Sequence, residues 1–193
     1  MYPTTTYAHS LVAIESLVGL LGVAMATGLM FARFSRPTAR TLFSRVAAIA
    51  PYNGKPTFMF RVANQRRNQI LEANLGVVVV QSEVTEEGQF MRRIRDLKLV
   101  RNQTPIFALS WTAMHPIDEN SPLWGATPES LAEKAVEIVV TLTGLDETFS
   151  QTVHARHSYI ASEVIWDRQF VDLFSQRPNG QYVIDYHHFH DVK

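Results

Sequence analysis

The chain has 193 residues, a formal net charge of zero at pH 7 and 46% hydrophobic residues. This length leaves room for one membrane-crossing segment and one further domain of about 150 residues, so two further domains are not expected. The absence of cysteine excludes disulfides and thiolate chemistry, and the balanced charge gives no support to nucleic-acid binding, which requires a basic face.

The first predicted element is a single transmembrane helix. Residues 11–34 hold the only long apolar run, and the seventeen residues from Ser16 to Ala32 carry no charge. That length is at the lower limit of the roughly 17 to 25 residues that cross a bilayer. A helix from about Thr6 to Phe34 would be about 43 Å long and could span. These residues alone leave open whether lipid surrounds the helix or whether it packs in an oligomer around an aqueous space.

Three features of this helix favour packing in an oligomer. Glu15 must find water or a partner, and intramembrane acids usually face a cavity or a bundle interior. Val23, Thr27 and Phe31 recur every four residues, so they lie on one slowly drifting face. Small residues also recur at spacings that allow helix backbones to approach closely: Gly19, Gly22, Ala24, Ala26 and Gly28.

The orientation follows from the arginines. Arg33, Arg36, Arg40 and Arg45 come after the apolar run, whereas residues 1–10 contain no Lys or Arg, so residues 1–10 are predicted outside and the large domain in the cytoplasm. The same absence argues against a cleaved signal peptide. Residues 35–45 form a basic linker in which Pro37 ends the helix, and its arginines attract anionic headgroups at about 1 kcal/mol each.

Residues 46–193 predict a β-sandwich domain of immunoglobulin-like type with seven or so strands. Its strand segments are rich in β-branched and aromatic residues: residues 56–62, 70–80, 90–100, 105–114, 136–145 and 182–186. Turns are predicted at Asn53-Gly54, Glu87-Gly88 and Asn179-Gly180. One short helix is predicted at residues 127–134, with Thr127 as its cap and Pro128 in its first turn.

The residue pattern favours neither a metal site nor an enzyme. His187, His188, His190 and Asp191 invite a metal site, as do His154 and His157, but no cysteine can complete a structural zinc site. Ser110, Ser121 and Ser158 lie in no recognisable nucleophile context, and the sequence has no glycine-rich phosphate loop. Neither a metal site nor an enzyme is predicted.

A resemblance covers the whole chain. Its motifs, in order, are GLMFARFSRP, LFSR, FMFRVANQR, ILEA, VTEEG, HPIDENSPLWG, HARHSYI, IWDRQFVD and IDYHHFHD. Together they resemble the inner helix and cytoplasmic domain of inward-rectifier potassium channels. The forms MFARFSRP and DLKLVRNQTPIF are more similar to the bacterial, KirBac-like branch. Members of that family place an outer helix, a pore helix and a selectivity filter before the inner helix, and no residue here matches that filter. The chain is therefore expected to be the C-terminal part of a channel.

The resemblance implies roles for residues of the helix. Val23 stands at the inner-cavity position that is acidic in strong rectifiers, so strong cationic block is not expected there. Phe31 matches the bulky residue at the helix-bundle crossing, where four rings would form a hydrophobic gate, and Gly19 matches the proposed hinge. Thr27 lies on the same pore-lining face. Arg33, Arg36 and Arg40 match positions that contact phosphoinositide, with inhibition expected if the lipid has any effect.

In the cytoplasmic domain, the resemblance implies that Glu147 lines the pore, and that Gln89 neutralises a second position that is acidic in strong rectifiers. The segment 152–156 matches a loop that forms the narrowest constriction. His154 and Ala155 are therefore candidate gate residues, and His154 is a candidate pH-sensitive element.

The predicted function is that of the gating and conduction module of a potassium channel. It would be a homotetramer in the bacterial inner membrane, passing potassium ions without a cofactor and contacting anionic phospholipid. The alternative is a non-conducting single-pass protein whose cytoplasmic β-sandwich assembles or senses.

Overall fold

The computed structural model describes residues 4–34, 40–66, 68–177 and 179–193. The chain divides into two compact units, Met1–Thr38 and Ala39–Lys193, and each is treated by itself. The first holds the long helix α1 (Thr6–Phe34), and the second holds every described strand. Residues 41–45, which the sequence assigns to the linker, lie in the second compact unit with the strands. The strand formed there has only three residues, which is too short for a sequence pattern to indicate.

Helix α1 is the 29-residue apolar helix expected from the sequence. By length and composition it can cross a membrane. It begins at Thr6, so half of the predicted outer segment 1–10 is helical, and it ends at Phe34, one residue before the expected stop. Arg33 in its last turn complements the negative end of the helix dipole.

The second unit is a two-sheet sandwich with more strands than predicted. The first sheet holds β1 (Thr41–Phe43), β2 (Ala47–Tyr52), β3 (Lys55–Asn64), β7 (Ser110–Pro116) and β10 (Val164–Trp166). The second sheet holds β4 (Ile70–Val84), β5 (Phe90–Asp96), β6 (Gln103–Phe107), β8 (Glu137–Asp146) and β9 (Gln151–Ile160). The predicted sandwich is confirmed, although β10 pairs with β2 in parallel rather than antiparallel.

Inward-facing residues of both sheets form one hydrophobic core. Phe58 and Phe60 from β3 meet Val79 of β4 and Ile138 of β8, and all four are fully buried. Alternation along β8 and β9 leaves every second side chain on the outer face of the second sheet. That outer face is available for contacts outside the sandwich.

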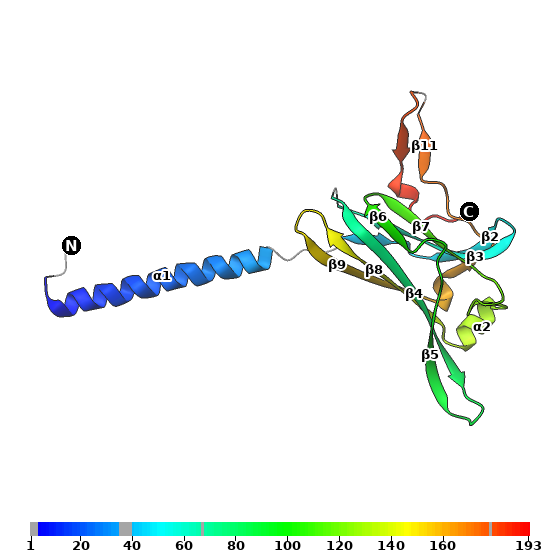
Figure 1. Ribbon diagram of the computed structural model, residues 1–193, viewed down its shortest axis with the longest axis horizontal. Helices are drawn as coiled ribbons and strands as arrows, with labels where there is room; N and C mark the ends of the chain where they lie inside the picture. The colour runs from blue at the N-terminus through cyan, green and yellow to red at the C-terminus, as the bar shows by residue number, and fades with distance from the viewer. Residues whose placement is uncertain (1–3, 35–39, 67, 178) are drawn as a thin grey trace. The chain divides into compact units, whose positions relative to one another are not determined.

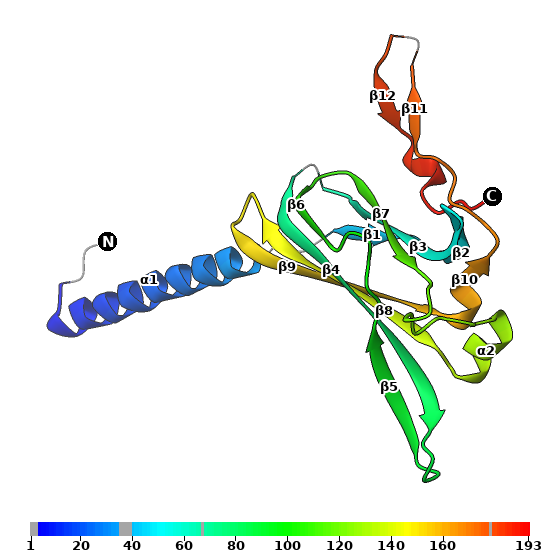
Figure 2. The ribbon, with the colours of Figure 1, turned by 45° about the vertical axis from the view of Figure 1, so that its right-hand side comes forward.

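Two hairpins project from the sandwich in both ribbon views (Figures 1 and 2). One is the outer part of β4 and β5, closed by the predicted turn at Gly88. The other is β11 (Phe174–Gln176) with β12 (Tyr182–Ile184), closed around the predicted turn at Gly180. The predicted short helix is present as α2 (Pro128–Glu133), where Thr127 Oγ1 accepts the Ser130 N–H at 3.2 Å.

The C-terminal segment is held against the first sheet by a buried arginine. Arg61 donates to the carbonyls of Val171 and His188, and its guanidinium lies 4.7 Å from the Phe170 ring centre. Burial lowers the pKa of Arg61 below its usual value. Phe189 is fully buried nearby, in a small cluster with Ala63 and Leu173. The domain also contains two short 3₁₀ turns, at Ala161–Glu163 and at Tyr186–His188. The second lies directly before Phe189.

Candidate functional site

The predicted pore face of α1 is exposed along its length. Val23 is 67% exposed and Phe31 is 73% exposed, and no residue of the helix is buried by the rest of the described chain. A Cβ added at Gly19 would meet no atom within 4 Å. The same is true at Gly22 and Gly28, so the described residues leave open space beside all three glycines of the helix.

A β-bulge turns an acid outward at one end of the second sheet. The register of β4 against β8 shifts between Leu71 and Asn74, and Glu72 has a positive φ of 49° and an exposed side chain. Gly144 of β8 faces this bulge, and a Cβ there would lie 2.4 Å from Ile70 Cγ2 and 3.0 Å from the Leu71 carbonyl oxygen. The bulge and the glycine thus form one packing unit that positions Glu72.

Asp146 organises the turn that carries Glu147. Its side chain is 2% exposed and accepts the Asn68 amide at 2.8 Å and the Arg66 guanidinium at 3.3 Å. It also accepts the backbone N–H groups of Thr148 and Phe149 at 2.9 and 3.1 Å. These bonds fix the β8–β9 turn and leave Glu147 exposed.

Glu72 and Glu147 lie at the same end of the second sheet, because Ile70 pairs with Asp146 in the β4–β8 register. Glu147 was predicted from the sequence, whereas Glu72 was not. The run ILEANLG resembles an uninterrupted strand, and nothing in it signals that a glutamate adopts a left-handed backbone.

The expected constriction loop at residues 152–156 is a strand. These residues lie within β9 and pair with β8, so the prediction of a loop was wrong. Alternation separates the two candidate gate residues: His154 is exposed beside Thr143, whereas Ala155 packs against the hydrophobic core. Of the two, only His154 presents its side chain to the space outside the domain. The gate assignment itself stays a prediction.

The arginines predicted to bind lipid are distributed over both units. Arg33 lies in the last turn of α1, and Arg40 is exposed just before β1, where its carbonyl accepts the Gln65 N–H at 2.9 Å. Arg36 lies outside the described residues. Their lipid contacts stay a prediction.

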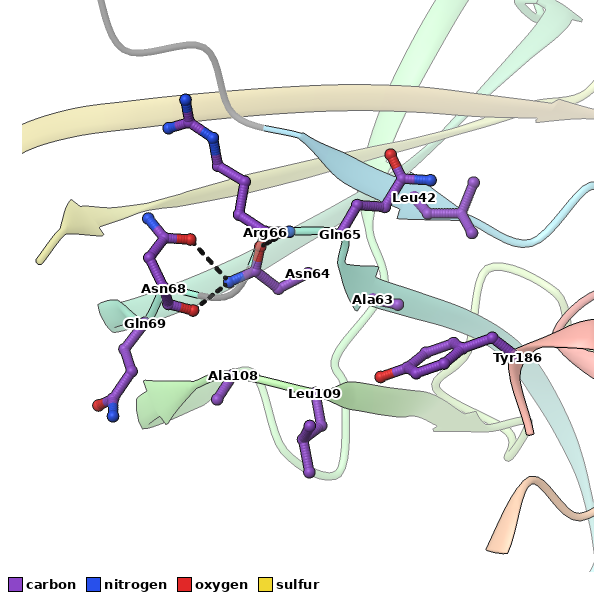
Figure 3. A pocket seen from close by; sticks show the side chains of 10 residues that line it. All are labelled: Leu42, Ala63, Asn64, Gln65, Arg66, Asn68, Gln69, Ala108, Leu109 and Tyr186. Carbon is purple, nitrogen blue, oxygen red and sulfur yellow. Dashed lines mark hydrogen bonds between the residues drawn. The ribbon is translucent and has the colours of Figure 1, made fainter. Parts of the chain in front are cut away.

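A cavity in the β-rich unit has a volume of about 600 Å³ (Figure 3). Leu42, Leu109 and Tyr186 give it an apolar side, and the β3–β4 connection gives it an amide-rich side. In that connection Asn64 Nδ2 donates to the Asn68 carbonyl at 2.8 Å. The only cationic side chain that lines the described cavity is Arg66, whose charge is already paired with Asp146, so the cavity is poorly suited to an isolated anion.

The histidines set aside in the sequence analysis make contacts within the protein. His188 Nδ1 lies 2.7 Å from Asp191 Oδ2, and this bond raises the pKa of His188. His190 Nδ1 accepts the Arg45 N–H at 3.2 Å, and burial, followed by the Arg45 charge, lowers the pKa of His190. Within the residues that the structure describes, no group of three His, Cys, Asp or Glu side chains is placed to hold a metal ion.

A buried serine and histidine pair is also accounted for by the fold. Ser121 Oγ lies 2.7 Å from His115 Nε2, and His115 Nδ1 lies 2.7 Å from the Lys98 carbonyl oxygen. Because that second partner is a carbonyl rather than a carboxylate, and both side chains are buried, the pair lacks the orienting acid and the access that a nucleophile needs.

Comparison with known proteins decides the family. A family profile described as the inward rectifier potassium channel C-terminal domain matches residues 41–193. The chain belongs to the inward-rectifier potassium channel family. The matched residues coincide with the β-rich unit, so the family assignment rests on the sandwich and not on the helix alone.

Individual relatives agree with this assignment. The chain is 47% identical over 192 residues to the inward rectifier potassium channel Kirbac3.1 of Paramagnetospirillum magnetotacticum, with 100% of the chain and 65% of that relative covered. It is 35% identical to the ATP-sensitive inward rectifier potassium channel 12 of Gallus gallus, and 36% identical to the inward rectifier potassium channel 18 of Homo sapiens. In both, 93% of this chain matches 43% of the relative.

These relatives bear on two of the predictions. The recognition of an inward-rectifier channel of the bacterial branch is confirmed, since Kirbac3.1 matches over the whole chain. The prediction that the chain is not an enzyme is confirmed, because these relatives are named as channels. The chain spans about two thirds of the bacterial relative and less than half of the animal ones.

Proposed function

We propose that this chain is the C-terminal gating and conduction module of a bacterial inward-rectifier potassium channel. The observation that carries the proposal is the family match over residues 41–193, directly after a helix that is long and apolar enough to span a membrane. The channel is a homotetramer in the bacterial inner membrane, with the β-rich unit in the cytoplasm. It passes potassium ions passively and needs no cofactor.

The gate lies on the face of α1 that carries Val23, Thr27 and Phe31. Four copies bring four Phe31 rings around one axis, and a constriction lined by such rings closes by excluding water. Gly19, a weak helix former with no side chain to pack, is the point at which the helix bends when the rings separate. Val23 carries no charge, so this cavity does not hold a cationic blocker strongly.

Potassium is concentrated at the acidic end of the second sheet. Glu147 and Glu72 are exposed there, and four copies place eight carboxylates around the axis, where their summed field raises the local concentration of cations.

The stoichiometry of the chain tests the proposal. Native mass spectrometry of the detergent-solubilised chain is expected to give the mass of four copies. A monomer or a dimer as the only species would contradict the channel and favour the alternative of a single-pass protein that assembles or senses without conducting.

Anionic phospholipid is the proposed regulatory partner, through Arg33, Arg36 and Arg40. Phosphoinositide added to liposomes that contain a complete channel ending in this chain is expected to lower potassium flux. Neutralising Arg33 and Arg40 with glutamine is expected to weaken that inhibition, while glutamine at Arg177, an exposed arginine on the β11–β12 hairpin, leaves it intact. Activation by the lipid would overturn the proposed sign of regulation.

A further inference from the structure

The segment that leads from β7 to α2 presents a tryptophan to solvent (Figure 1). Trp124 is 58% exposed, whereas Trp111 and Trp166 are partly buried against the hydrophobic core. The indole is a large apolar ring that is mostly buried in folded proteins, and tryptophan is enriched among the residues that dominate binding interfaces. The two cation–ring contacts found among the described residues involve Phe170 and Trp111, so the face of the Trp124 ring is open to a partner.

Trp124 lines a cavity of about 370 Å³, here called the Trp124 pocket. Pro56 and Ile117 are the other apolar residues of its lining, and residues 118–120 give it a polar side. A cavity of a few hundred Å³ that combines apolar side chains with a few polar groups is the usual form of a ligand site.

Buried groups hold the turn that carries Trp124. The Oγ of Ser121 lies 2.7 Å from Nε2 of His115 and accepts the N–H of Leu123 at 3.1 Å. Leu123 is itself buried, and the Trp124 N–H donates to the Ser121 carbonyl at 2.9 Å. The indole is therefore presented by a backbone that needs little ordering when a ligand binds.

The Trp124 pocket carries a net negative charge. Asp118 and Glu119 supply two carboxylates and Lys55 supplies one ammonium group, and all three residues are exposed. Neither acid belongs to an ion pair found in the part of the chain that the structure describes. This charge repels the phosphates of lipids and nucleic acids and attracts a cation.

The aromatic and acidic sides of the pocket together select an organic cation. In the described residues, no group of three His, Cys, Asp or Glu side chains is placed to hold a metal ion. A guanidinium group fits both sides, because it is planar, stacks on an indole face and donates two parallel hydrogen bonds to a carboxylate. The same domain already contains such a stack, with the guanidinium of Arg101 lying 5.5 Å from the ring centre of Trp111.

We propose that the Trp124 pocket binds an exposed arginine of a basic segment of a partner protein. The guanidinium stacks on Trp124 and bonds to Asp118 or Glu119, while the aliphatic part of the arginine lies along Ile117. The pocket belongs to the connection between β7 and α2, away from the pore-lining residues named above. Its function therefore does not depend on the number of copies in the channel.

Peptide binding to the full-length chain in detergent tests the proposal. The probe is a fluorescein-labelled peptide in which arginine alternates with glycine, and the matched control peptide carries uncharged citrulline in place of each arginine. Fluorescence anisotropy is expected to show saturable binding of the arginine peptide and roughly tenfold weaker binding of the control. Equal binding of the two peptides would overturn the proposal, because the positive charge would then not be recognised.

Variants assign the binding to the pocket. Trp124→Ala is expected to weaken binding of the arginine peptide roughly tenfold, and Trp124→Phe to weaken it less, because a phenyl ring keeps part of the attraction to a cation. The double variant Asp118→Asn, Glu119→Gln should also weaken binding, although it keeps an acceptor for the Asn120 N–H, which Asp118 Oδ1 holds at 3.0 Å. Lys55→Ala should strengthen binding, since it removes a competing cation.

The matched charge control is Glu86→Gln, Glu87→Gln, which neutralises two exposed acids at the turn between β4 and β5 and should leave binding unchanged. An equal loss of binding in this control would show non-specific attraction and would overturn the pocket. A lysine peptide that binds as tightly as the arginine peptide would overturn the assignment to a guanidinium group.

Circular dichroism during denaturant titration separates lost binding from a lost fold. The acids at positions 118 and 119 are exposed, so their double variant is expected to unfold at the same denaturant concentration as the natural chain. If that variant is folded and still binds the peptide as tightly, the proposal is overturned whatever Trp124→Ala shows. None of these results changes the proposed channel function, which stoichiometry and ion flux test.

Discussion

Two histidines in the β-rich unit are held in their neutral forms by their surroundings. Burial lowers the pKa of His157, which stacks on Phe43 with 5.3 Å between ring centres. Burial and then the Arg45 charge lower the pKa of His190. In an unfolded chain histidine titrates near about pH 6.5. As the pH falls below that value the unfolded state takes up protons first, so the stability that these groups contribute above it is progressively lost.

Acidification is therefore expected to destabilise the β-rich unit through His157 and His190, and the raised pKa of the exposed His188 opposes this effect. The free energy of unfolding, measured by denaturant titration, should fall between pH 7.5 and pH 5. All three tryptophans lie in this unit, so their fluorescence reports its unfolding. His157→Phe should reduce the pH dependence, and His9→Asn, a change in the exposed start of α1, should not. Equal stability at the two pH values in the natural chain would contradict the assignment.

Gly144 lies where a side chain would press against the β-bulge that positions Glu72. Gly144→Ala places a methyl group against Ile70 and the Leu71 carbonyl, and is expected to cost about 1 to 3 kcal/mol. Gly76→Ala is the matched control, because its Cβ meets a single side-chain atom, the Thr141 hydroxyl oxygen at 2.9 Å, and no backbone atom. Denaturant titrations of both variants, followed by tryptophan fluorescence, compare the two costs. Equal costs would show that the bulge at Glu72 tolerates a side chain opposite it.

The β8–β9 turn depends on a single buried carboxylate. Asp146→Ala removes the acceptor for two backbone N–H groups and for Asn68 and Arg66, and is expected to cost about 1 to 3 kcal/mol. Asp146→Asn keeps one acceptor oxygen for the turn and should cost less. Denaturant titration gives both values. A larger cost for the asparagine variant would mean that the turn bonds are not the main contribution of Asp146.

The strands that could be predicted from sequence are those whose own residue types favour a strand. β3, β4 and β8 are long and rich in β-branched or aromatic residues, and α2 has a cap and a first-turn proline. β2, with the sequence AAIAPY, was missed because alanine has low strand preference and its burial comes from long-range pairing. β9 was missed because its outer face is polar, with His154 and Arg156.

One predicted strand covers parts of two observed strands that belong to different sheets. Residues 105–114 form the end of β6 in the second sheet and most of β7 in the first, and the chain crosses between them at Ala108 and Leu109. The change of sheet depends on which strands pair, and no periodicity within ten residues records that. The predicted strand at residues 90–100 was too long for a related reason: the pairing of β5 with β4 ends at Asp96.

At the scale of the whole molecule, the sequence motifs indicated the family, whereas the proposed pore cannot be seen in a single copy of the chain. Val23, Thr27, Phe31 and Glu147 were named from the resemblance, and all are exposed in the single chain. The function proposed for them depends on symmetry-related copies, so no contact within one chain could reveal it. Glu72 required the bulge to be seen, because the register shift between β4 and β8 is set by strand pairing and not by local sequence.

The central claim is that α1 forms the gate of a potassium channel, and potassium flux through a complete channel tests it most directly. The upstream part of Kirbac3.1, joined to this chain and reconstituted in liposomes, is expected to conduct potassium. Phe31→Ala is expected to raise the initial rate severalfold, because the ring of aromatic side chains is lost. Leu29→Ala, at a residue that is also 73% exposed but on another face of the helix, should leave the rate nearly unchanged. A tetrameric channel without flux, or equal effects of the two substitutions, would contradict the account.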